Sequence, residues 1–319
     1  PSPPFGFKRF NEGGLVVCSY PDKHGNPDEY LAFAGSFFSR QHKHCDDMGF
    51  QFFANGKGIL TDAGSFTYHY EQEERIFIES TRAHNCLEID GYDYSRFNSD
   101  IFGSCIDYAE EVGECIFIEG SVNRVKLVPT EIPYNKVKGA DCEKCDIKQR
   151  RIIFYLPKRF LIIIDDVKAR KDRSFTQWFN LFPNISASIE DEGVVLGSPD
   201  EVVGILRDLQ ISPTEVRLAR GQEDPRLHGW VSNNGHTLEK TDSVGIVSSG
   251  KSVTIGTMID LKFNKTRKVS MNIGTGGKYI RVVVNGRNGK TEMIVRQKSD
   301  EVILEFIENG EESKVSISN

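Results

Sequence analysis

The sequence predicts an all-β protein, a large antiparallel β-sandwich of stacked sheets. From Leu15 onward, short runs rich in Val, Ile, Phe and Tyr alternate with Gly, Asn, Asp and Pro, which is the pattern of strands and turns. Asn-Gly pairs at 55–56, 285–286 and 309–310 stand at or just after such runs, where they supply the positive φ angles of tight hairpin turns. No stretch shows the spacing and caps of a helix of three or more turns.

The expected strands follow one another at short intervals along the whole chain. Those before position 220 are 15–20, 30–35, 50–56, 86–91, 115–122, 150–157, 159–167, 174–182, 193–198 and 214–219. The last third adds 252–263, 268–273, 279–286, 291–297, 301–310 and 313–318. In the run 279–286, Val283 is apolar although its neighbours Val282 and Val284 lie on the other face. We therefore expect this strand to be covered on both faces, which requires two or more stacked sheets.

Length and charge bound the remaining possibilities. We expect residues 1–319 to form one large β-sandwich unit, and the first residue, Pro1, indicates a piece of a longer product. No apolar run approaches the ~18 residues of a membrane-spanning helix, so no membrane span is expected. A formal charge of −6 argues against a nucleic acid held by a broad basic field, but it is compatible with a local basic pocket for an anionic ligand.

The chain contains seven cysteines, an odd number in a protein too large to need disulfide bonds for stability. Most are expected to be reduced core residues. Cys142 and Cys145 form the one CxxC pair, within the charged stretch KVKGADCEKCDIKQRR. Without a second pair, a surface loop is the better interpretation than a zinc or redox site.

The stretch 41–91 collects histidines among carboxylates and tyrosines. His42 and His44 are two residues apart, so a strand would direct both imidazoles to one face. Asp62 and His84 each end an expected strand or begin a turn, where side chains of neighbouring strands converge. Two histidines and one carboxylate suit zinc, with room for a water molecule. Spacing alone does not distinguish this set from a buried hydrogen-bonded histidine and a turn-forming aspartate.

The same stretch resembles the C-terminal β-sandwich part of the heparinase II/III-like polysaccharide lyases, which include heparin and alginate lyases. The elements that carry the resemblance are HKHCD, FFANG, LTDAG, STRAHN and EIDG, in this order. Weaker similarity continues through RIIFYLPKRFLIIIDDV, QWFNLFP and LHGWVSNNG, so the resemblance covers roughly the whole chain. Asn180 stands where some relatives carry a histidine.

The resemblance implies a metal-containing part of an enzyme that cleaves uronic-acid-containing glycans by β-elimination. It implies that His44, Asp62 and His84 hold the metal, most simply a zinc ion that braces the site, and that His42 faces the substrate. Elimination requires a neutralised C6 carboxylate, a base for the C5 proton and an acid for the departing O4.

Tyr68 and Tyr70 lie between Asp62 and His84, and a strand would place both rings on one face. One of them is a candidate for the acid or for a sugar contact, as in alginate-cleaving relatives, and packing within the fold is an equal alternative.

Two arginines and a tryptophan are candidates for substrate binding. Arg75 and Arg82 could pair with an acidic sugar, or equally with the nearby carboxylates of Glu73, Glu74 and Glu79. Trp230 follows a glycine in a loop-like context, where an indole face suits stacking on a sugar ring. Trp178, inside an apolar strand, is better explained as a core residue.

In the resembling family an N-terminal α/α toroid packs beside the sandwich and completes the cleft, and this sequence contains no such helical region. We therefore expect the fragment to hold one side of an active site and to be inactive alone. The alternative is a non-catalytic carbohydrate-binding or structural module that keeps a structural metal. Metal-dependent hydrolysis, with Asp46 as base, is the weaker third interpretation. The resemblance implies a periplasmic or secreted location, and the sequence leaves a cytoplasmic one open.

Overall fold

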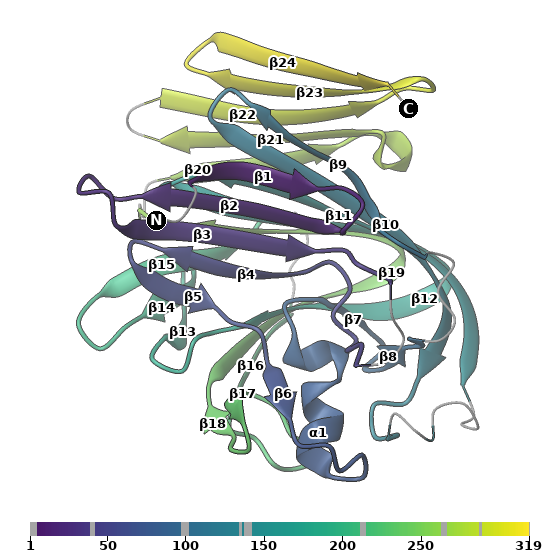
Figure 1. Ribbon diagram of the computed structural model, residues 1–319. Coiled ribbons are helices and arrows are strands. Elements are labelled where there is room, and N and C mark those ends of the chain that lie inside the picture. Colours follow the sequence, from purple (N-terminus) through teal and green to yellow (C-terminus); the bar gives the residue numbers. More distant parts are fainter. Residues whose placement is uncertain are drawn as a thin grey trace.

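The computed structural model describes residues 5–38, 42–96, 102–133, 136, 142–210, 215–262, 267–286 and 289–318. Nearly all of their regular structure is antiparallel strand, arranged in four sheets (Figure 1). The expected all-β class with stacked sheets is therefore confirmed. Within the described ranges, no helix has the length and apolar character needed to cross a membrane.

The first sheet is a five-stranded meander at the start of the chain. Its strands follow in order: β1 (Gly6–Phe10), β2 (Leu15–Pro21), β3 (Pro27–Ala34), β4 (Gly49–Ala54) and β5 (Lys57–Leu60). Asn55 and Gly56 join the last two strands with φ angles of 53° and 70°, so the predicted hairpin turn is present.

The largest sheet occupies the middle of the fold. Its main path runs β13-β14-β15-β19-β12-β11-β10-β8, with β7, β9 and β16 paired alongside. The strands are β7 (Leu87–Ile89), β8 (Asp93–Tyr94), β9 (Ile106–Val112), β10 (Cys115–Val128), β11 (Glu143–Leu156), β12 (Phe160–Asn180), β13 (Ser186–Glu190), β14 (Gly193–Gly197), β15 (Val202–Asp208), β16 (Glu215–Arg220) and β19 (Asp242–Asp260). The separate strands expected at 159–167 and 174–182 form the single strand β12. Its exposed charged middle stays extended, and its pairing with β19 shifts register between Lys168 and Arg173.

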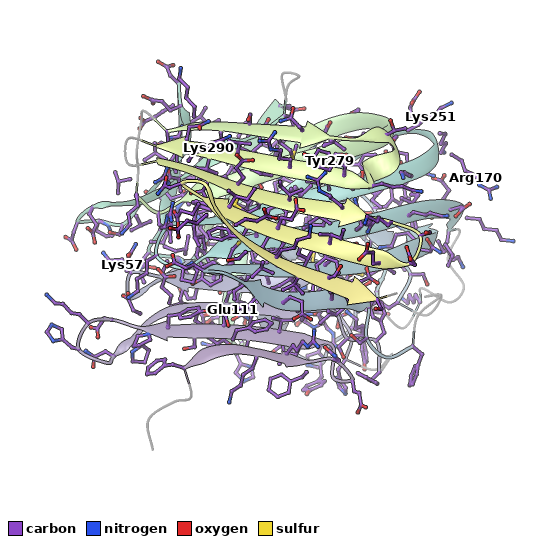
Figure 2. The ribbon with its side chains drawn as sticks, turned by 90° about the horizontal axis from the view of Figure 1, so that it is seen from above. Lys57, Glu111, Arg170, Lys251, Tyr279 and Lys290 are labelled. Carbon is purple, nitrogen blue, oxygen red and sulfur yellow. The ribbon has the colours of Figure 1, made fainter. Side chains whose placement is uncertain are left out.

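The chain ends in a second five-stranded sheet, which Figure 2 shows from above, lying over the strands of the large sheet. Its elements are β20 (Lys268–Ile273), the 3₁₀ turn Thr275–Gly277, β21 (Tyr279–Gly286), β22 (Gly289–Gln297), β23 (Glu301–Glu308) and β24 (Glu311–Ser318). A small lobe carries the remaining elements: β6 (Gly64–Phe66), the helix α1 (Glu73–Ile78), the 3₁₀ turn Thr81–Ala83, β17 (Trp230–Gly235) and β18 (Glu239–Lys240).

Both faces of the large sheet are buried at the centre of the fold, which explains the unbroken apolar runs of its strands there. Along β11, Ile153 and Tyr155 pack in one core with the first sheet, whereas Ile152 and Phe154 pack in a second core with the C-terminal sheet. Successive side chains of a strand point to opposite faces, so only a strand between two layers needs apolar residues at every position. Each such side chain contributes about 1.5–3 kcal/mol on full burial.

Two of the finer sequence predictions can be compared directly with the fold. Val283 is buried, but it belongs to neither main core and its face of β21 also carries the partly exposed Arg281, so cover on both faces of this strand stays a prediction. All seven cysteines are free thiols and five of them are buried, which fits reduced core residues. Cys142 directly precedes β11 and Cys145 lies within it, so the predicted surface loop is wrong at this point.

Candidate functional site

Four of the candidate residues, His42, His44, Tyr68 and Arg75, line an open cavity of about 480 Å³ at the small lobe. The cavity lies among the loop before β4, the loop between β6 and α1, the helix itself and the turn that follows β17. The residues that line it are His42, His44, Ser65, Phe66, Thr67, Tyr68, Arg75, Ile78, Glu79, Gly235 and His236.

The two histidines of the HKHCD element reach the cavity from a loop. Residues 42–48 form turns and bends ahead of β4, and His42 and Met48 have left-handed φ angles of 59° and 58°. The prediction of a strand for this element is therefore wrong. The expected outcome still holds, because His42 and His44 both line the same cavity.

His84 and Asp62 form a hydrogen-bonded pair beside His44. The His84 Nδ1 atom lies 2.8 Å from Asp62 Oδ2, and the rings of His44 and His84 are 5.3 Å apart between centroids. His84 is buried, and no described group bonds its second nitrogen, Nε2. The three residues named from the sequence therefore lie together.

Burial and the close pairing set the charges of this trio. Burial and, to a lesser degree, the neighbouring His84 together lower the pKa of His44 to about 4, so the ring is neutral near pH 7. Burial alone would raise the pKa of Asp62, but the His84 imidazole outweighs it and brings the pKa down to about 2. Burial opposes the charged form of His84 as well, and Asp62 raises the His84 pKa above its ordinary value.

The donor set suits a divalent metal ion in its chemistry, since imidazole and carboxylate are zinc ligands. The unbonded, buried His84 Nε2 is consistent with a missing partner at that atom. In the part of the chain that the structure describes, no group of three His, Cys, Asp or Glu side chains is arranged to hold a metal. Metal binding by His44, Asp62 and His84 thus stays a prediction.

Tyr68 and Tyr70 lie on the loop between β6 and α1, so the strand that would have aligned their rings is wrong. Tyr68 is 75% exposed, and its ring stands edge-on to the His42 ring with 6.1 Å between centroids. The Arg75 guanidinium lies 4.2 Å from the Tyr70 ring centroid and 5.6 Å from that of Tyr68. Arg75 thus holds both aromatic rings on one side of the cavity.

Both candidate arginines, Arg75 and Arg82, form hydrogen bonds with other groups of the protein. Arg75 is buried and bonds Glu79 at 2.9 Å and the Thr67 carbonyl at 2.7 Å, which matches the carboxylate alternative for this residue. Arg82 is buried and donates from Nε to the Leu227 carbonyl at 3.1 Å. Burial lowers the Arg82 pKa. Arg82 does not line the described cavity.

The two tryptophans and Asn180 also have identifiable partners. Trp178 is a core residue, as expected, and its indole N–H donates to Glu88 at 3.0 Å. Trp230 is half-buried, donates to the Gln222 carbonyl at 2.9 Å, and does not line the described cavity. Asn180 is buried, and its backbone N–H donates to the Asn85 side chain at 2.7 Å.

Sequence reasoning missed Asn85, the residue that ties the candidate segments together. Its amide nitrogen donates to the carbonyls of Phe50 at 2.7 Å and Thr61 at 2.9 Å, and its amide oxygen accepts from Asn180. Because Asn85 follows His84 and Thr61 precedes Asp62, one buried amide fixes the relative positions of both residues. The motif STRAHN contained this asparagine, and only its histidine was given a role.

A buried arginine was missed as well. Arg151 makes a two-pronged ion pair with Asp165 and donates to the carbonyls of Met48 at 2.9 Å and Asn85 at 2.7 Å. An arginine inside an unbroken apolar run indicates a buried, paired charge, because arginines are rarely fully buried without a partner. That signal was present in RRIIFYLP.

Ion pairs and hydrogen bonds of charged side chains also fix the HKHCD loop. Lys43 pairs with Asp46 and Asp47, so Asp46 bonds a lysine and not a histidine. Arg96 bonds Glu79 at 3.1 Å and the Lys43 carbonyl at 2.5 Å. The loop that presents the two imidazoles is therefore fixed by buried ion pairs. His236, exposed on the cavity rim, is a further lining residue that the sequence did not single out.

Comparison with known proteins identifies relatives at the level of family and fold. The family model described as heparinase II/III-like, C-terminal, matches residues 2–273. No curated protein sequence matches significantly. Three similar solved structures are the heparan sulfate lyase HepC from Pedobacter heparinus, heparinase III, and a heparinase III that is the BT4657 gene product. Their identities are 14%, 15% and 16%, and their TM-scores are 0.64, 0.63 and 0.66. They cover 100%, 99% and 99% of this chain, but this chain covers only 43%, 43% and 42% of theirs.

Proposed function

Because this chain belongs to the heparinase II/III-like C-terminal family, we propose that it forms one wall of the active site of a polysaccharide lyase. The reaction is β-elimination on a glycan that contains uronic acid, and the rest of the cleft comes from another part of a longer chain. The observation that carries the proposal is the cavity shared by His42, His44 and Tyr68 beside the Asp62–His84 pair.

His42 and Tyr68 have the exposure that contact with a polymer requires. Both residues line the cavity, and their rings pack edge-on against each other. The His42 imidazole donates a hydrogen bond to the sugar carboxylate, which stabilises the charge that develops when the C5 proton leaves. The Tyr68 hydroxyl protonates the departing O4 oxygen as general acid, and the base that takes the C5 proton comes from the part of the cleft that another segment of the longer chain supplies. Tyr70 stacks on Arg75 and keeps the tyrosine loop in place.

His44, Asp62 and His84 would hold the metal, for which we propose zinc. The support is the donor set, the contact between the two imidazole rings, and the buried His84 Nε2 without a partner. When bound, such an ion braces the loops that carry His42 and Tyr68. The elimination itself needs no metal hydroxide, since the proton moves between organic groups.

A pair of variants in the full-length protein tests the proposed roles. Tyr68→Phe and His42→Ala should each lower the rate of unsaturated product formation from a uronate polymer by about 10²-fold or more, the usual contribution of a general acid or charge-stabilising group. Tyr30→Phe, which alters a partly exposed tyrosine in the first sheet, is the matched control and should keep the wild-type rate. Wild-type rates in both test variants would remove the chemistry from this cavity.

A further inference from the structure

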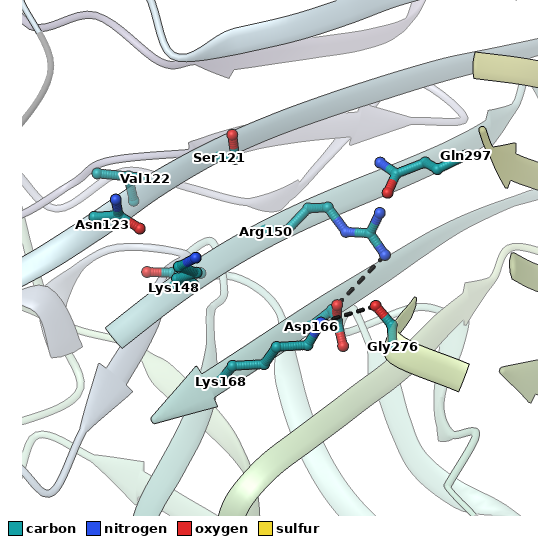
Figure 3. Close-up of a pocket in the computed structure, with 10 residues that line it drawn as sticks. Ser121, Val122, Asn123, Lys148, Arg150, Asp166, Lys168, Gly276 and Gln297 are labelled. Atoms are coloured by element: carbon teal, nitrogen blue, oxygen red, sulfur yellow. Dashed lines mark hydrogen bonds and ion pairs between the residues drawn. The ribbon is translucent and has the colours of Figure 1, made fainter. Parts of the chain in front are cut away.

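A second hollow, of about 320 Å³, lies on the face of the large sheet that points away from the first sheet. Figure 3 shows its side chains on three adjacent strands, β10, β11 and β12, with the turn before β21 and the end of β22 beside them. The lining is polar and charged; its one apolar residue, Val122, packs its side chain into the core shared with the first sheet. The lining residues are Ser121, Val122, Asn123, Lys148, Gln149, Arg150, Asp166, Lys168, Gly276 and Gln297.

The strand register places two lysines directly opposite each other in this hollow. Lys148 of β11 pairs with Lys168 of β12, and Asn123 of β10 stands opposite Lys148. Like charges at directly opposed positions of a sheet are destabilising. Lys148 has no ion pair or side-chain hydrogen bond within the described part of the chain. Lys168 donates one bond, at 2.8 Å, to the Gly276 carbonyl, which leaves two of its three donors available.

The neighbouring rows of the same sheet face are charge-matched. On one side Arg170 bonds Asp146 at 2.7 Å, and on the other Arg150 lies 3.4 Å from Asp166. Glu119 lies 3.6 Å from Arg150 as well, so the Arg150 guanidinium faces two carboxylates. The lysine row is therefore a local positive centre in a chain whose formal charge is −6.

The wall of the hollow is built by a close backbone approach. Arg150 donates to the Gly277 carbonyl at 2.6 Å, and Gly277 has a φ of 72°. A Cβ atom at this glycine would lie 2.5 Å from an Asp166 oxygen, so only glycine lets the turn approach the Arg150–Asp166 pair this closely. Gly276, Gly277 and Gln297 lie beyond the family-matched residues 2–273.

From this arrangement we propose that Lys148 and Lys168 bind an acidic sugar residue of the polysaccharide, through its carboxylate or sulfate group. An anion placed across the two ammonium groups relieves their repulsion, and the Asn123 amide offers a hydrogen bond to the same ligand. The hollow has the volume of a small-ligand site. The site rests on the proposed function for the identity of its ligand, and it retains the polymer away from the catalytic cavity.

Binding is measured by calorimetry with the full-length protein and unsaturated uronate disaccharides, one sulfated and one unsulfated, which contain no further bond to eliminate. Lys148→Gln with Lys168→Gln should weaken binding of at least one disaccharide by about tenfold or more, because the two substitutions remove both charged donors to the anion. The control, Lys8→Gln with Lys251→Gln, makes the same change of charge at exposed lysines elsewhere and should retain wild-type affinity.

A second variant separates loss of the site from loss of the fold. Lys148→Glu would face Lys168 with the opposite charge, so it should raise the melting temperature while it abolishes disaccharide binding. Wild-type affinity in both lysine variants overturns the proposal, as does binding of inorganic sulfate without either disaccharide. If the protein bound a disaccharide through these lysines but showed no lyase turnover, the lysine site would stand and the proposed function would be refuted. Failure of the site and failure of the proposed function therefore give different results.

Discussion

Replacement of Asn85 should destabilise the fold far more than its small side chain suggests. In Asn85→Ala, the carbonyls of Phe50 and Thr61 and the backbone N–H of Asn180 each lose a buried partner. A buried polar group left without a partner costs about 1–3 kcal/mol, so three give a loss of about 3 kcal/mol or more. Domains are commonly stable by about 5–15 kcal/mol, so this loss is a large share of the total.

Urea unfolding followed by tryptophan fluorescence measures that loss. Asn85→Asp sharpens the test because it keeps the size of the side chain and the acceptor for Asn180, but it loses both donated bonds. It should be strongly destabilised at pH 7 and partly recover in acid, where a protonated carboxyl can donate one bond. Asn272→Ala, at an exposed position of β20, is the control. A loss below about 1 kcal/mol in Asn85→Ala, equal to that of the control, would refute the central position given to this amide.

Three further predictions concern the metal ligands, a buried acid and the second hollow. His84→Ala should lower the melting temperature more than His42→Ala, because it removes a buried group bonded to a carboxylate and not an exposed ring; equal shifts in calorimetry would contradict these roles. Burial raises the pKa of Glu119 from 4.5 to about 7, so the folded state holds this proton more tightly than the unfolded chain. Stability should fall by up to roughly 3 kcal/mol as the pH rises from about 4.5 to about 7, and Glu119→Gln should flatten that part of the urea-unfolding profile. Lys148→Gln should raise the free energy of unfolding by about 0.2–1 kcal/mol through relief of the repulsion from Lys168, and a lower value would contradict the like-charge argument.

The layered β fold could be predicted because its signals are local. Short apolar runs between turn residues indicate strands, Asn-Gly pairs indicate hairpins, and the unbroken apolar run 152–156 at the end of β11 indicates burial on both faces. The expected strands at the HKHCD element and at Tyr68 failed for a tertiary reason. The Lys43–Asp47 ion pair holds the first segment as a loop, and a hydrogen bond from Arg75 to the Thr67 carbonyl holds the second. These partners are not evident from alternation.

The supporting frame of the site could not be placed from local sequence. Arg151 meets the carbonyls of Met48 and Asn85 across 103 and 66 residues of chain. The strand pairing that creates these contacts is a property of the whole sheet. The sequence was enough to name His44, Asp62 and His84, and these three residues do lie together. Their hydrogen-bond geometry could not be predicted from the sequence.

The central claim is tested most directly by incubating the full-length protein with a panel of uronate polymers while recording both ultraviolet absorbance and new reducing ends. β-Elimination leaves a C4–C5 double bond in every product, so absorbance and reducing ends should rise together on at least one polymer, and His42→Ala should slow both. New reducing ends without the absorbance would mean hydrolysis. Binding of the polymers without any cleavage would mean that the sandwich is a carbohydrate-recognition module, and either result would contradict the lyase account.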